Sequence, residues 1–330
     1  MTSQTLDSLQ IEHSSREEVV SIVIATFNSR GTIERCIESI RVQHCPHIEI
    51  IVVDDGSTDD TTAIAEQTGA RVLRLQKNFG VSYALNRGIE LASGRYVFTL
   101  DSDAELIPAV MGKAIAALRS GSCEVVGGTY IAPFVDRGLS RLIELYRKAI
   151  HVIPHSEIFM GATNPQVSGT FLGFKAEIFQ VEKFDESLRA IQDREFLCRL
   201  ARKGFRILYS PELVVYHRVP SSLFGFVRRT WTLAVWTNIA GMRYPVIIKR
   251  RLVLAAGVAA TLALTLHGLP AVLPLAILAY YLRFVISCLA KKGLGMPLRD
   301  ALSVAALAIF VSIIELASLV GSVFTRPTNW

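Results

Sequence analysis

Short apolar runs alternate with amphipathic segments from Val19 to about Pro220. The runs at 19–25 (VVSIVIA) and 48–53 (IEIIVV) are rich in β-branched residues, which is typical of strands buried on both faces. Between them, the apolar residues at 33, 37 and 40 recur at the spacing of one helix face. The pattern therefore predicts a strand, a helix and a second strand.

The alternation continues with a shorter strand at 71–75, a helix at 80–92 and a strand at 96–100. Strands that alternate with helices predict an α/β domain with a mostly parallel sheet and helices on both faces. In such a sheet, ligands bind beyond the carboxyl ends of the strands. The acidic motifs Asp54-Asp55 and Asp101-Ser102-Asp103 each follow a strand directly, so both are expected at that edge.

The later part of this region predicts further strands at 124–131 and 206–217 and a helix at 193–203. We therefore expect one α/β domain over residues 19–220. The polar segment 1–18 in front of it lacks the apolar core of a secretory signal and is expected to be a flexible tail.

The rest of the chain has the composition of a membrane region, 251–330, with apolar stretches at 252–267, 269–290 and 301–324. A spanning helix needs about 20 apolar residues, which the second and third stretches supply. The first is short, so it either spans by recruiting its flanks, which gives about three helices, or is re-entrant. The preceding segment, 221–250, mixes aromatic residues with arginines, which favours amphipathic helices lying in the membrane interface. A soluble helix packed on the α/β domain is the alternative.

The charge of the chain changes this picture little. Its formal net charge is +6, and much of the excess stands beside the apolar stretches, as in Lys249-Arg250-Arg251 and Lys291-Lys292. Cations at these places mark the cytoplasmic side and attract anionic lipid headgroups. We therefore expect a multi-pass protein of the cell membrane with its α/β domain in the cytoplasm, and no nucleic-acid partner. The five scattered cysteines agree with a reducing compartment.

The Asp-x-Asp motif at 101–103 is the first candidate for chemistry. Carboxylate oxygens are the ligands that Mg²⁺ and Mn²⁺ prefer. Sugar transfer from a nucleoside diphosphate needs such a cation, because the leaving diphosphate gains negative charge. It also needs a carboxylate that accepts the proton of the acceptor hydroxyl.

Six segments together resemble the family 2 glycosyltransferases of the GT-A fold, and they occur in the family's order. They are SIVIATFNS (21–29), IIVVDDGSTDDT (50–61), KNFGVSYALNRGIELASGRYVFTLDSD (77–103), VSGTFLGFKAEIF (167–179), FDESLRAIQDREFLCRLARKGFRI (184–207) and PELVVYH (211–217). The resemblance covers about 20–217 and implies a nucleotide-sugar-dependent transferase.

The resemblance implies a role for several residues on the donor side. Ala25, Phe27 and Asp55 would contact the nucleotide, with Asp55 accepting from an N–H of the base. Lys77 and Asn78 would lie near the donor. From the residues alone, Asp55 could instead cap the turn into the next helix.

The metal and the base are implied in the same way. Asp101 would lie near the ribose and the metal, Asp103 would be the principal metal ligand, and His217 would approach the metal or the diphosphate. Asp193 would be the general base. A purely structural role is the alternative for His217, and an acid placed at a helix N-terminus is the alternative for Asp193.

Two residues depart from the family's pattern. Gln192 precedes the expected base where many relatives have Glu, which affects the expected acceptor contacts. Phe27 stands where Tyr is frequent, so a stacking face is kept without its hydroxyl.

The resemblance implies an inverting transfer from a UDP- or GDP-sugar, dependent on Mn²⁺ or Mg²⁺. The membrane region favours a lipid-linked saccharide or glycolipid as acceptor, in glycan or polysaccharide biosynthesis. A polyprenyl-phosphate sugar synthase is the first alternative, and an inactive membrane scaffold that binds nucleotide is the second. The Q-x-x-R-W segment of processive synthases does not occur in the sequence, and the oligomeric state is open.

Overall fold

The computed structural model describes residues 19–43, 45, 47–133, 138–151, 155–161, 165, 167–220, 222–243, 275–276, 279–283, 286 and 297–324. They form two compact units. We call Met1–Pro133 with His155–Arg218 the sheet unit, and Phe134–Pro154 with Val219–Trp330 the helical unit. The flexible tail expected at 1–18, the apolar stretch 252–267 and most of 269–290 lie outside the described residues.

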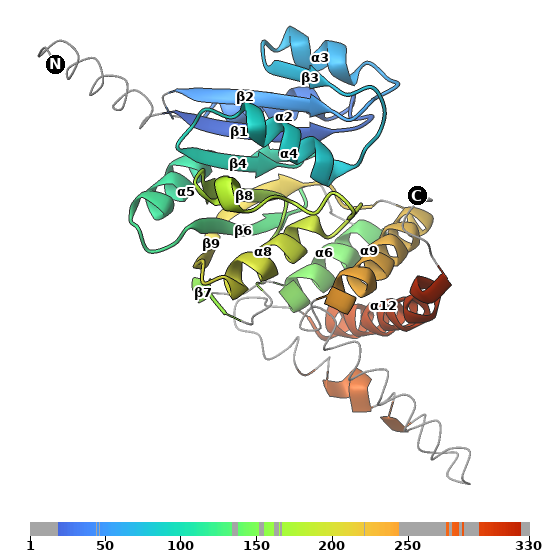
Figure 1. Cartoon of the computed structure of the whole chain (residues 1–330). Coiled ribbons are helices and arrows are strands. Elements are labelled where there is room, and N and C mark those ends of the chain that lie inside the picture. Colours follow the sequence, from blue (N-terminus) through green and yellow to red (C-terminus); the bar gives the residue numbers. More distant parts are fainter. Residues whose placement is uncertain are drawn as a thin grey trace, which may run out of the picture. The chain divides into compact units, whose positions relative to one another are not determined.

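The sheet unit is an α/β structure around one sheet, with strand order β3-β2-β1-β4-β8-β6-β9-β5 and with β7 paired to β9 (Figure 1). Its strands are β1 Val20–Thr26, β2 Ile48–Asp54, β3 Arg71–Arg74, β4 Tyr96–Leu100, β5 Ala104–Leu106, β6 Val125–Ile131, β7 Glu157–Phe159, β8 Phe171–Lys175 and β9 Ile207–His217. Its helices are α2 Ile33–Arg41, α3 Thr61–Gln67, α4 Val81–Leu91, α5 Val110–Arg119, α7 Ile178–Val181 and α8 Gln192–Arg202.

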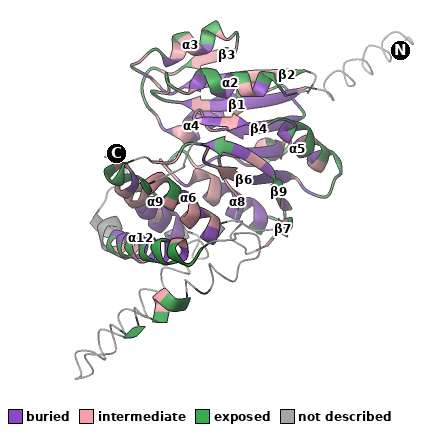
Figure 2. Ribbon diagram, turned by 180° about the vertical axis from the view of Figure 1, so that it is seen from behind, coloured by how far each residue is buried: buried purple, intermediate pink, exposed green. Residues whose placement is uncertain are grey.

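The predicted parallel part of the sheet is confirmed. Strands β3, β2, β1 and β4 run parallel, and β6 also runs parallel to β9. Strand β8 lies antiparallel between β4 and β6, and β5 and β7 pair antiparallel with β9. Figure 2 shows the central strands mostly buried, in agreement with their continuous apolar sequences.

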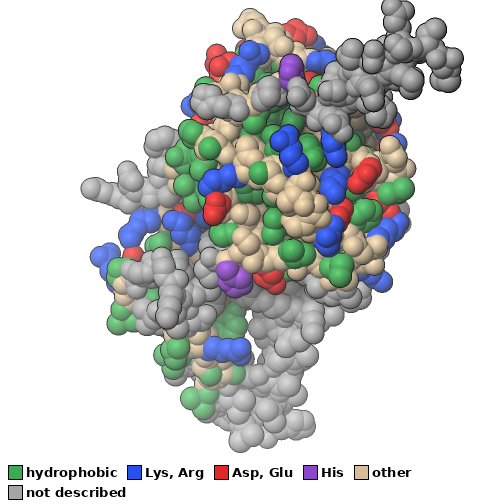
Figure 3. Space-filling view, turned by 90° about the vertical axis from the view of Figure 1, so that its left-hand side faces the viewer, with side chains coloured by type: hydrophobic (Ala, Val, Ile, Leu, Met, Phe, Trp, Pro, Cys, Tyr) green, Lys and Arg blue, Asp and Glu red, His purple; other side chains and the backbone are tan. Residues whose placement is uncertain are grey.

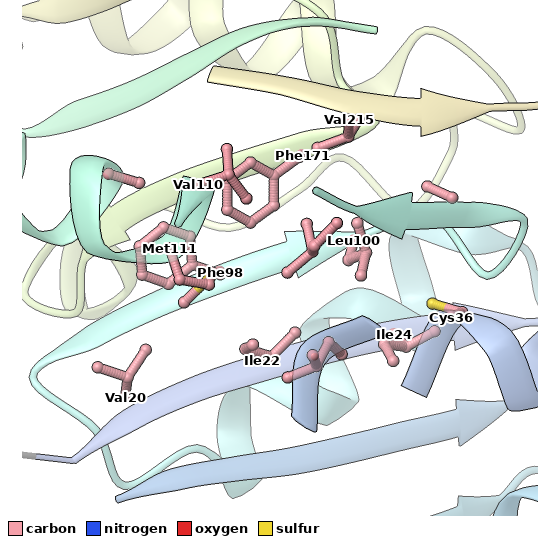
Figure 4. Close-up of a cluster of buried hydrophobic side chains, with 14 of the residues drawn as sticks. Val20, Ile22, Ile24, Cys36, Phe98, Leu100, Val110, Met111, Phe171 and Val215 are labelled. Atoms are coloured by element: carbon pink, nitrogen blue, oxygen red, sulfur yellow. The ribbon is translucent and has the colours of Figure 1, made fainter. Parts of the chain in front are cut away.

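The two faces of β1 explain why its sequence is apolar throughout. Ile22 and Ile24 belong to the large core cluster, which also contains Phe98 from β4 and Met111 from α5 (Figure 4). Val23 faces the other way, towards α4, where Gly88 lets the helix approach closely. Burial on both faces fixes β1 at the centre of the sheet.

The surface of the sheet unit carries both signs of charge. Figure 3 shows one face of the molecule, on which Lys and Arg side chains are interspersed with Asp and Glu. Ion pairs between elements of the sheet unit include Lys113–Glu212 at 2.7 Å and Lys183–Glu90 at 2.8 Å. Such exposed pairs each contribute little to stability, on the order of 0–1 kcal/mol.

The helical unit contains α6 Gly138–His151, α9 Leu223–Arg243 and α12 Leu298–Phe324. Small residues of α12 pack against an apolar stripe of α6 that includes Leu142, Leu145 and Ala149. An ion pair of 2.6 Å joins Arg141 to Asp300 at the start of α12. The structure thus assigns 134–154 to the helical unit, because α12 covers the apolar stripe of α6. The sequence analysis placed this segment within the domain 19–220.

The helix expected before the apolar stretches is present as α9, and it packs along α12. A buried hydrogen bond of 3.0 Å from the Asn238 amide to the Ser318 hydroxyl links the two helices. Among the described residues, the segment Leu298–Leu319 of α12 is long and apolar enough to cross a membrane. Its outward side carries exposed Leu302, Phe310 and Ile313, while much of its other side is buried.

Replacing Gly88 with Ala should destabilise the sheet unit by about 1–3 kcal/mol, because the new methyl group would overpack the interface between α4 and the sheet. A Cβ at this position would lie 2.4 Å from Cγ1 of Val23 and 2.9 Å from Cγ2 of Val53, both of which belong to buried strands. Urea unfolding followed by circular dichroism measures the change.

Gly112→Ala is the matched control. Position 112 lies in α5, and a Cβ there would meet nothing within 4 Å. Because alanine has the better helix propensity, this variant should gain up to about 1 kcal/mol. Equal effects of the two substitutions would contradict the close packing of α4 on β1 and β2.

Candidate functional site

Three strands deliver polar residues to one edge of the sheet. Thr26 of β1 is in register with Asp54 of β2, and β4 runs parallel to β1 and ends at Leu100, directly before Asp101. The amide of Asp55 donates to the carbonyl of Thr26 over 2.8 Å, which ties the two strand ends together. The sequence-based expectation that both acidic motifs share this edge is thus met.

The neighbouring carboxylates at the end of β2 have different partners. Asp54 is fully buried and accepts from the amide of Ser57 at 3.0 Å and from the hydroxyls of Ser57 and Thr62. It therefore holds the turn into α3. This is the structural role that the sequence analysis gave as the alternative for Asp55.

Asp55 holds a different segment. Its carboxylate oxygens accept from the amides of Phe79 at 2.7 Å and Gly80 at 2.8 Å, at the start of α4. Burial raises the pKa of Asp55, and the two amides and the nearby Arg189 oppose that rise. Each carboxylate oxygen has a second lone pair, so Asp55 can accept a further hydrogen bond while it holds this loop.

Asp101, Asp103 and His217 form a group that could hold a metal ion. One ligand atom from each lies within 4.8 Å of the others. Nε2 of His217 is 3.1 Å from Oδ1 of Asp103 and 3.7 Å from Oδ2 of Asp101. The imidazole is 4% exposed, whereas both carboxylates are about two-fifths exposed.

Strand pairing explains how the histidine reaches the Asp-x-Asp motif. Strand β5 follows Asp103 directly and pairs antiparallel with β9, with Ala104 opposite His217. A donor set of two carboxylates and one imidazole fits a divalent cation, and the exposed carboxylates leave room for ligands from a substrate. The expected metal-binding residues are therefore brought together.

Asp101 and Asp193 line a narrow cavity at the same edge. Ala25, Gly169 and Gln192 also line it. Asp193 lies in the first turn of α8, and its side chain packs against the backbone of Gly169, where a Cβ would be 2.0 Å from Oδ2 of Asp193. The expected base and the expected metal group thus face adjoining spaces.

A wider, open cleft lies on the other side of Asp101. Its lining combines the two carboxylates of the metal group with polar residues of the loop after β1: Ala25, Asn28, Ser29, Gly31, Thr32, Asp101, Ser102, Asp103 and Arg218. Asn28 adopts a left-handed conformation (φ 51°), and its side-chain oxygen accepts from the amide of Thr58 at 2.9 Å. This loop is therefore fastened to the turn that Asp54 holds.

The other expected donor-side residues lie close by but outside the lining of these two cavities. Phe27 follows β1 and is 45% exposed, so its ring is available for stacking. The ammonium of Lys77 lies 5.1 Å from the ring centroid of Phe79, and Asn78 accepts a hydrogen bond of 3.1 Å from Arg189.

Arg218 and Gly169 are among the lining residues that the sequence analysis did not single out. Arg218 directly follows His217 and brings a cation to the cleft that contains the metal group. Its position after a strand-end histidine was a usable signal. Gly169 seats the side chain of Asp193, a contact between residues far apart in the sequence that no local pattern signals.

Comparison with known proteins defines the class of this protein. Residues 21–185, half of the chain, match the family described as glycosyl transferase family 2. The chain belongs to this family and is a glycosyltransferase, as the sequence analysis expected.

Two of the bacterial relatives have names that refer to the biosynthesis of a polysaccharide. The chain is 30% identical over 225 residues to the succinoglycan biosynthesis protein ExoO of Rhizobium meliloti, with 63% of each protein covered. It is 28% identical over 228 residues to the putative teichuronic acid biosynthesis glycosyltransferase TuaG of Bacillus subtilis, covering 64% of this chain and 86% of TuaG. The match thus spans about three-fifths of the length of ExoO.

A shorter match concerns a named lipid-linked acceptor. Over 89 residues the chain is 42% identical to the Escherichia coli UDP-Glc:alpha-D-GlcNAc-diphosphoundecaprenol beta-1,3-glucosyltransferase WfaP, covering 26% of this chain and 36% of WfaP.

Solved structures share the fold. The mannosyltransferase PcManGT of Pyrobaculum calidifontis, solved with GDP-Man and Mn²⁺, superposes with a TM-score of 0.63 at 20% identity, covering 91% of this chain and 87% of that one. Residues 1–349 of Staphylococcus aureus TarS, solved with UDP-GlcNAc, give a TM-score of 0.51 at 19% identity, covering 91% of this chain and 89% of that one. The predicted GT-A type of α/β fold is confirmed.

Asp103→Ala should weaken Mn²⁺ binding by at least about tenfold, since it removes one of the two carboxylates of the metal group. Isothermal titration with Mn²⁺ in the presence of nucleoside diphosphate measures the loss. Glu105→Gln is the control, because Glu105 lies two residues away and is paired with Arg35 at 3.1 Å. Equal Mn²⁺ affinity in the two variants would remove Asp103 from the site.

Proposed function

We propose that this glycosyltransferase moves a sugar from a UDP- or GDP-sugar to a lipid-linked saccharide or glycolipid, with inversion at the anomeric carbon, in glycan or polysaccharide biosynthesis. The observation that carries the proposal is the position of the Asp193 carboxylate relative to the metal group. Asp101 and Asp103, which form a possible metal site with His217, line the open cleft, and Asp193 lines the narrow cavity. The two cavities share Asp101 and Ala25.

On the donor side, Asp55 accepts from an N–H of the base, while Ala25 and Phe27 contact the nucleotide and Lys77 and Asn78 lie beside it. Asp101, Asp103 and His217 hold a divalent cation. When bound, that cation neutralises the charge that develops on the leaving diphosphate. Support comes from PcManGT, solved with GDP-Man and Mn²⁺, and from TarS, solved with UDP-GlcNAc. The imidazole in the donor set favours Mn²⁺ over Mg²⁺.

On the acceptor side, Asp193 accepts the proton of the attacking hydroxyl. Asp193 lies in the first turn of α8, where an acid also suits the helix dipole, so the base role and the helix-acid alternative are compatible. One base that faces the acceptor while the diphosphate leaves on the metal side gives a single displacement, which inverts the anomeric carbon. The sugar carbon exchanges its bond to the diphosphate oxygen for a bond to the acceptor oxygen.

A membrane setting is supported by two observations. The segment Leu298–Leu319 of α12 is apolar enough to cross a bilayer, and the name of WfaP specifies an acceptor linked to diphosphoundecaprenol. We therefore propose a cell-membrane location, with the sheet unit on the cytoplasmic side, where nucleotide sugars are made. The further spanning helices expected at 252–267 and 269–290 belong to this proposal.

Asp193→Asn should lower kcat by about 10²–10⁴, the usual scale for loss of a general base, and leave the affinity for the nucleotide unchanged. Transfer is measured from a panel of UDP- and GDP-sugars with Mn²⁺ present, and nucleotide affinity by titration. Glu177→Gln, at an exposed acid directly before α7, is the control and should transfer normally. A large loss of nucleotide affinity in Asp193→Asn, with a high residual rate, would place Asp193 on the donor side instead.

The acceptor is tested in the same assay. Undecaprenyl diphosphate carrying a saccharide should accept the sugar, and undecaprenyl monophosphate should not. The reverse result would favour the polyprenyl-phosphate sugar synthase.

A fluorescent label at position 313, on the exposed side of α12, should be quenched by lipids that carry a nitroxide in the acyl chain. The measurement uses the cysteine-free protein reconstituted into vesicles. A label at position 113, on exposed Lys113 of α5 in the sheet unit, is the control and should not be quenched. Equal quenching at the two positions would contradict insertion of α12.

A further inference from the structure

Polar side chains at 78, 82 and 86 form a row along α4. The row begins in the loop 77–80 before the helix, which we call the donor loop because it contains Lys77 and Asn78. Asn78 precedes the helix, and Ser82 and Asn86 lie one turn apart on one face of it. All three bind the segment 184–189, about a hundred residues further along the chain. We call Asn78, Ser82 and Asn86 the polar row.

Asn86 makes the most extensive of these contacts. Its amide nitrogen donates to the carbonyl of Phe184 at 3.0 Å, and its amide oxygen accepts from the N–H of the same residue at 3.0 Å, with both bonds buried. The nitrogen also donates to Glu186 at 2.9 Å. One side chain thus satisfies both backbone groups of Phe184 and fixes its position and direction.

The other two members hold the segment nearer to the donor loop. The buried hydroxyl of Ser82 donates to the carbonyl of Leu188 at 3.0 Å. The side chain of Arg189 donates to Asn78 at 3.1 Å and lies against Gly80. Along the segment, Phe184 binds Asn86, Leu188 binds Ser82 and Arg189 binds Asn78. The segment therefore runs antiparallel to α4, towards the donor loop.

This segment leads directly to Asp193. Leu188 lies five residues before Asp193, Ile191 takes a left-handed conformation (φ 60°), and α8 begins at Gln192. Phe184 also lines the narrow cavity that Asp101 and Asp193 line. The polar row thus fixes both a wall of this cavity and the stretch of chain that brings Asp193 into it.

The donor side is joined to the same row. Asp55 binds the amides of Phe79 and Gly80, which lie between Asn78 and Ser82. Hydrogen bonds therefore tie Asp55 to the start of α4 and α4 to Leu188, and from Leu188 the chain itself leads to Asp193.

We infer that Ser82 and Asn86 are positioning residues for sugar transfer, which hold 184–191 so that Asp193 faces the space beside Asp101. The inference rests on the proposed function of Asp193. Neither side chain lines the cavity, so they act through the segment that they bind. A shift of the base by about 1 Å is enough to cost about 10²-fold in rate.

Ser82→Ala is the main test, because it removes one hydrogen bond and introduces a residue that favours the helix. It should lower kcat by about 10- to 100-fold, with the KM for the donor and the Mn²⁺-dependent nucleotide affinity unchanged. A rise in donor KM with unchanged kcat would overturn the inference.

A double-mutant cycle with Asp193→Asn separates positioning from loss of structure. If Ser82 acts through Asp193, Ser82→Ala should have no further effect on kcat once the base is absent. Equal loss in both backgrounds would overturn the inference. If Asp193→Asn alone transfers at the normal rate, the proposed base is wrong, and that result is distinct from failure of the positioning role.

Arg189→Ala keeps the inference testable if Ser82→Ala does not fold, because the contact between Arg189 and Asn78 is exposed. It should lower kcat several-fold, and the same cycle with Asp193→Asn should abolish the effect. Arg87→Ala is the matched control. Arg87 also lies on α4, but it is not part of the polar row, and its guanidinium is shared between the exposed carboxylates of Glu186 at 3.3 Å and Glu90 at 3.1 Å. An equal loss of kcat in Arg87→Ala would overturn the inference.

Discussion

The rest of the site depends on the two hydrogen bonds that the carboxylate of Asp55 accepts. Asp55 lies at the end of β2 and accepts from two amides at the start of α4, so it links the strand to the helix and the loop before it. Charge-assisted hydrogen bonds of this kind are among the stronger ones in proteins. Burial nevertheless raises the pKa of Asp55, so the protein keeps a carboxylate here against the cost of desolvation.

The metal group depends on a second constraint, the register between β5 and β9. Because Ala104 pairs with His217, the imidazole is buried beside the Asp-x-Asp motif although more than a hundred residues separate them in the sequence. Strand β9 also pairs with β6 and β7, so the histidine belongs to a strand that is held from several sides. The carboxylates remain partly exposed and can respond to a ligand, while the imidazole is fixed.

The parts of this structure that sequence reasoning predicted are those whose signal is local. Strands β1, β2 and β4 are contiguous apolar runs, and each acidic motif follows its strand directly, so the position of both motifs at one edge followed from the parallel sheet alone. What it missed depends on long-range pairing. The reversal of β8, the seat of Asp193 on Gly169 and the contacts of Ser82 and Asn86 join segments whose registers no local pattern specifies.

Helix α6 was not predicted from the sequence, and its packing has a consequence for how the chain is organised. Its apolar stripe shows that it is covered, but only packing identifies α12 as the cover. Because α6 lies between two parts of the sheet unit in the sequence, the chain passes between the units three times, at 133–134, 154–155 and 218–219. Removing the chain after Arg218 would leave the stripe of α6 exposed to water, at about 25 cal/mol for each Å² of apolar surface. The helical unit is therefore built partly from the middle of the sequence, and α6 needs α12 to cover its apolar stripe.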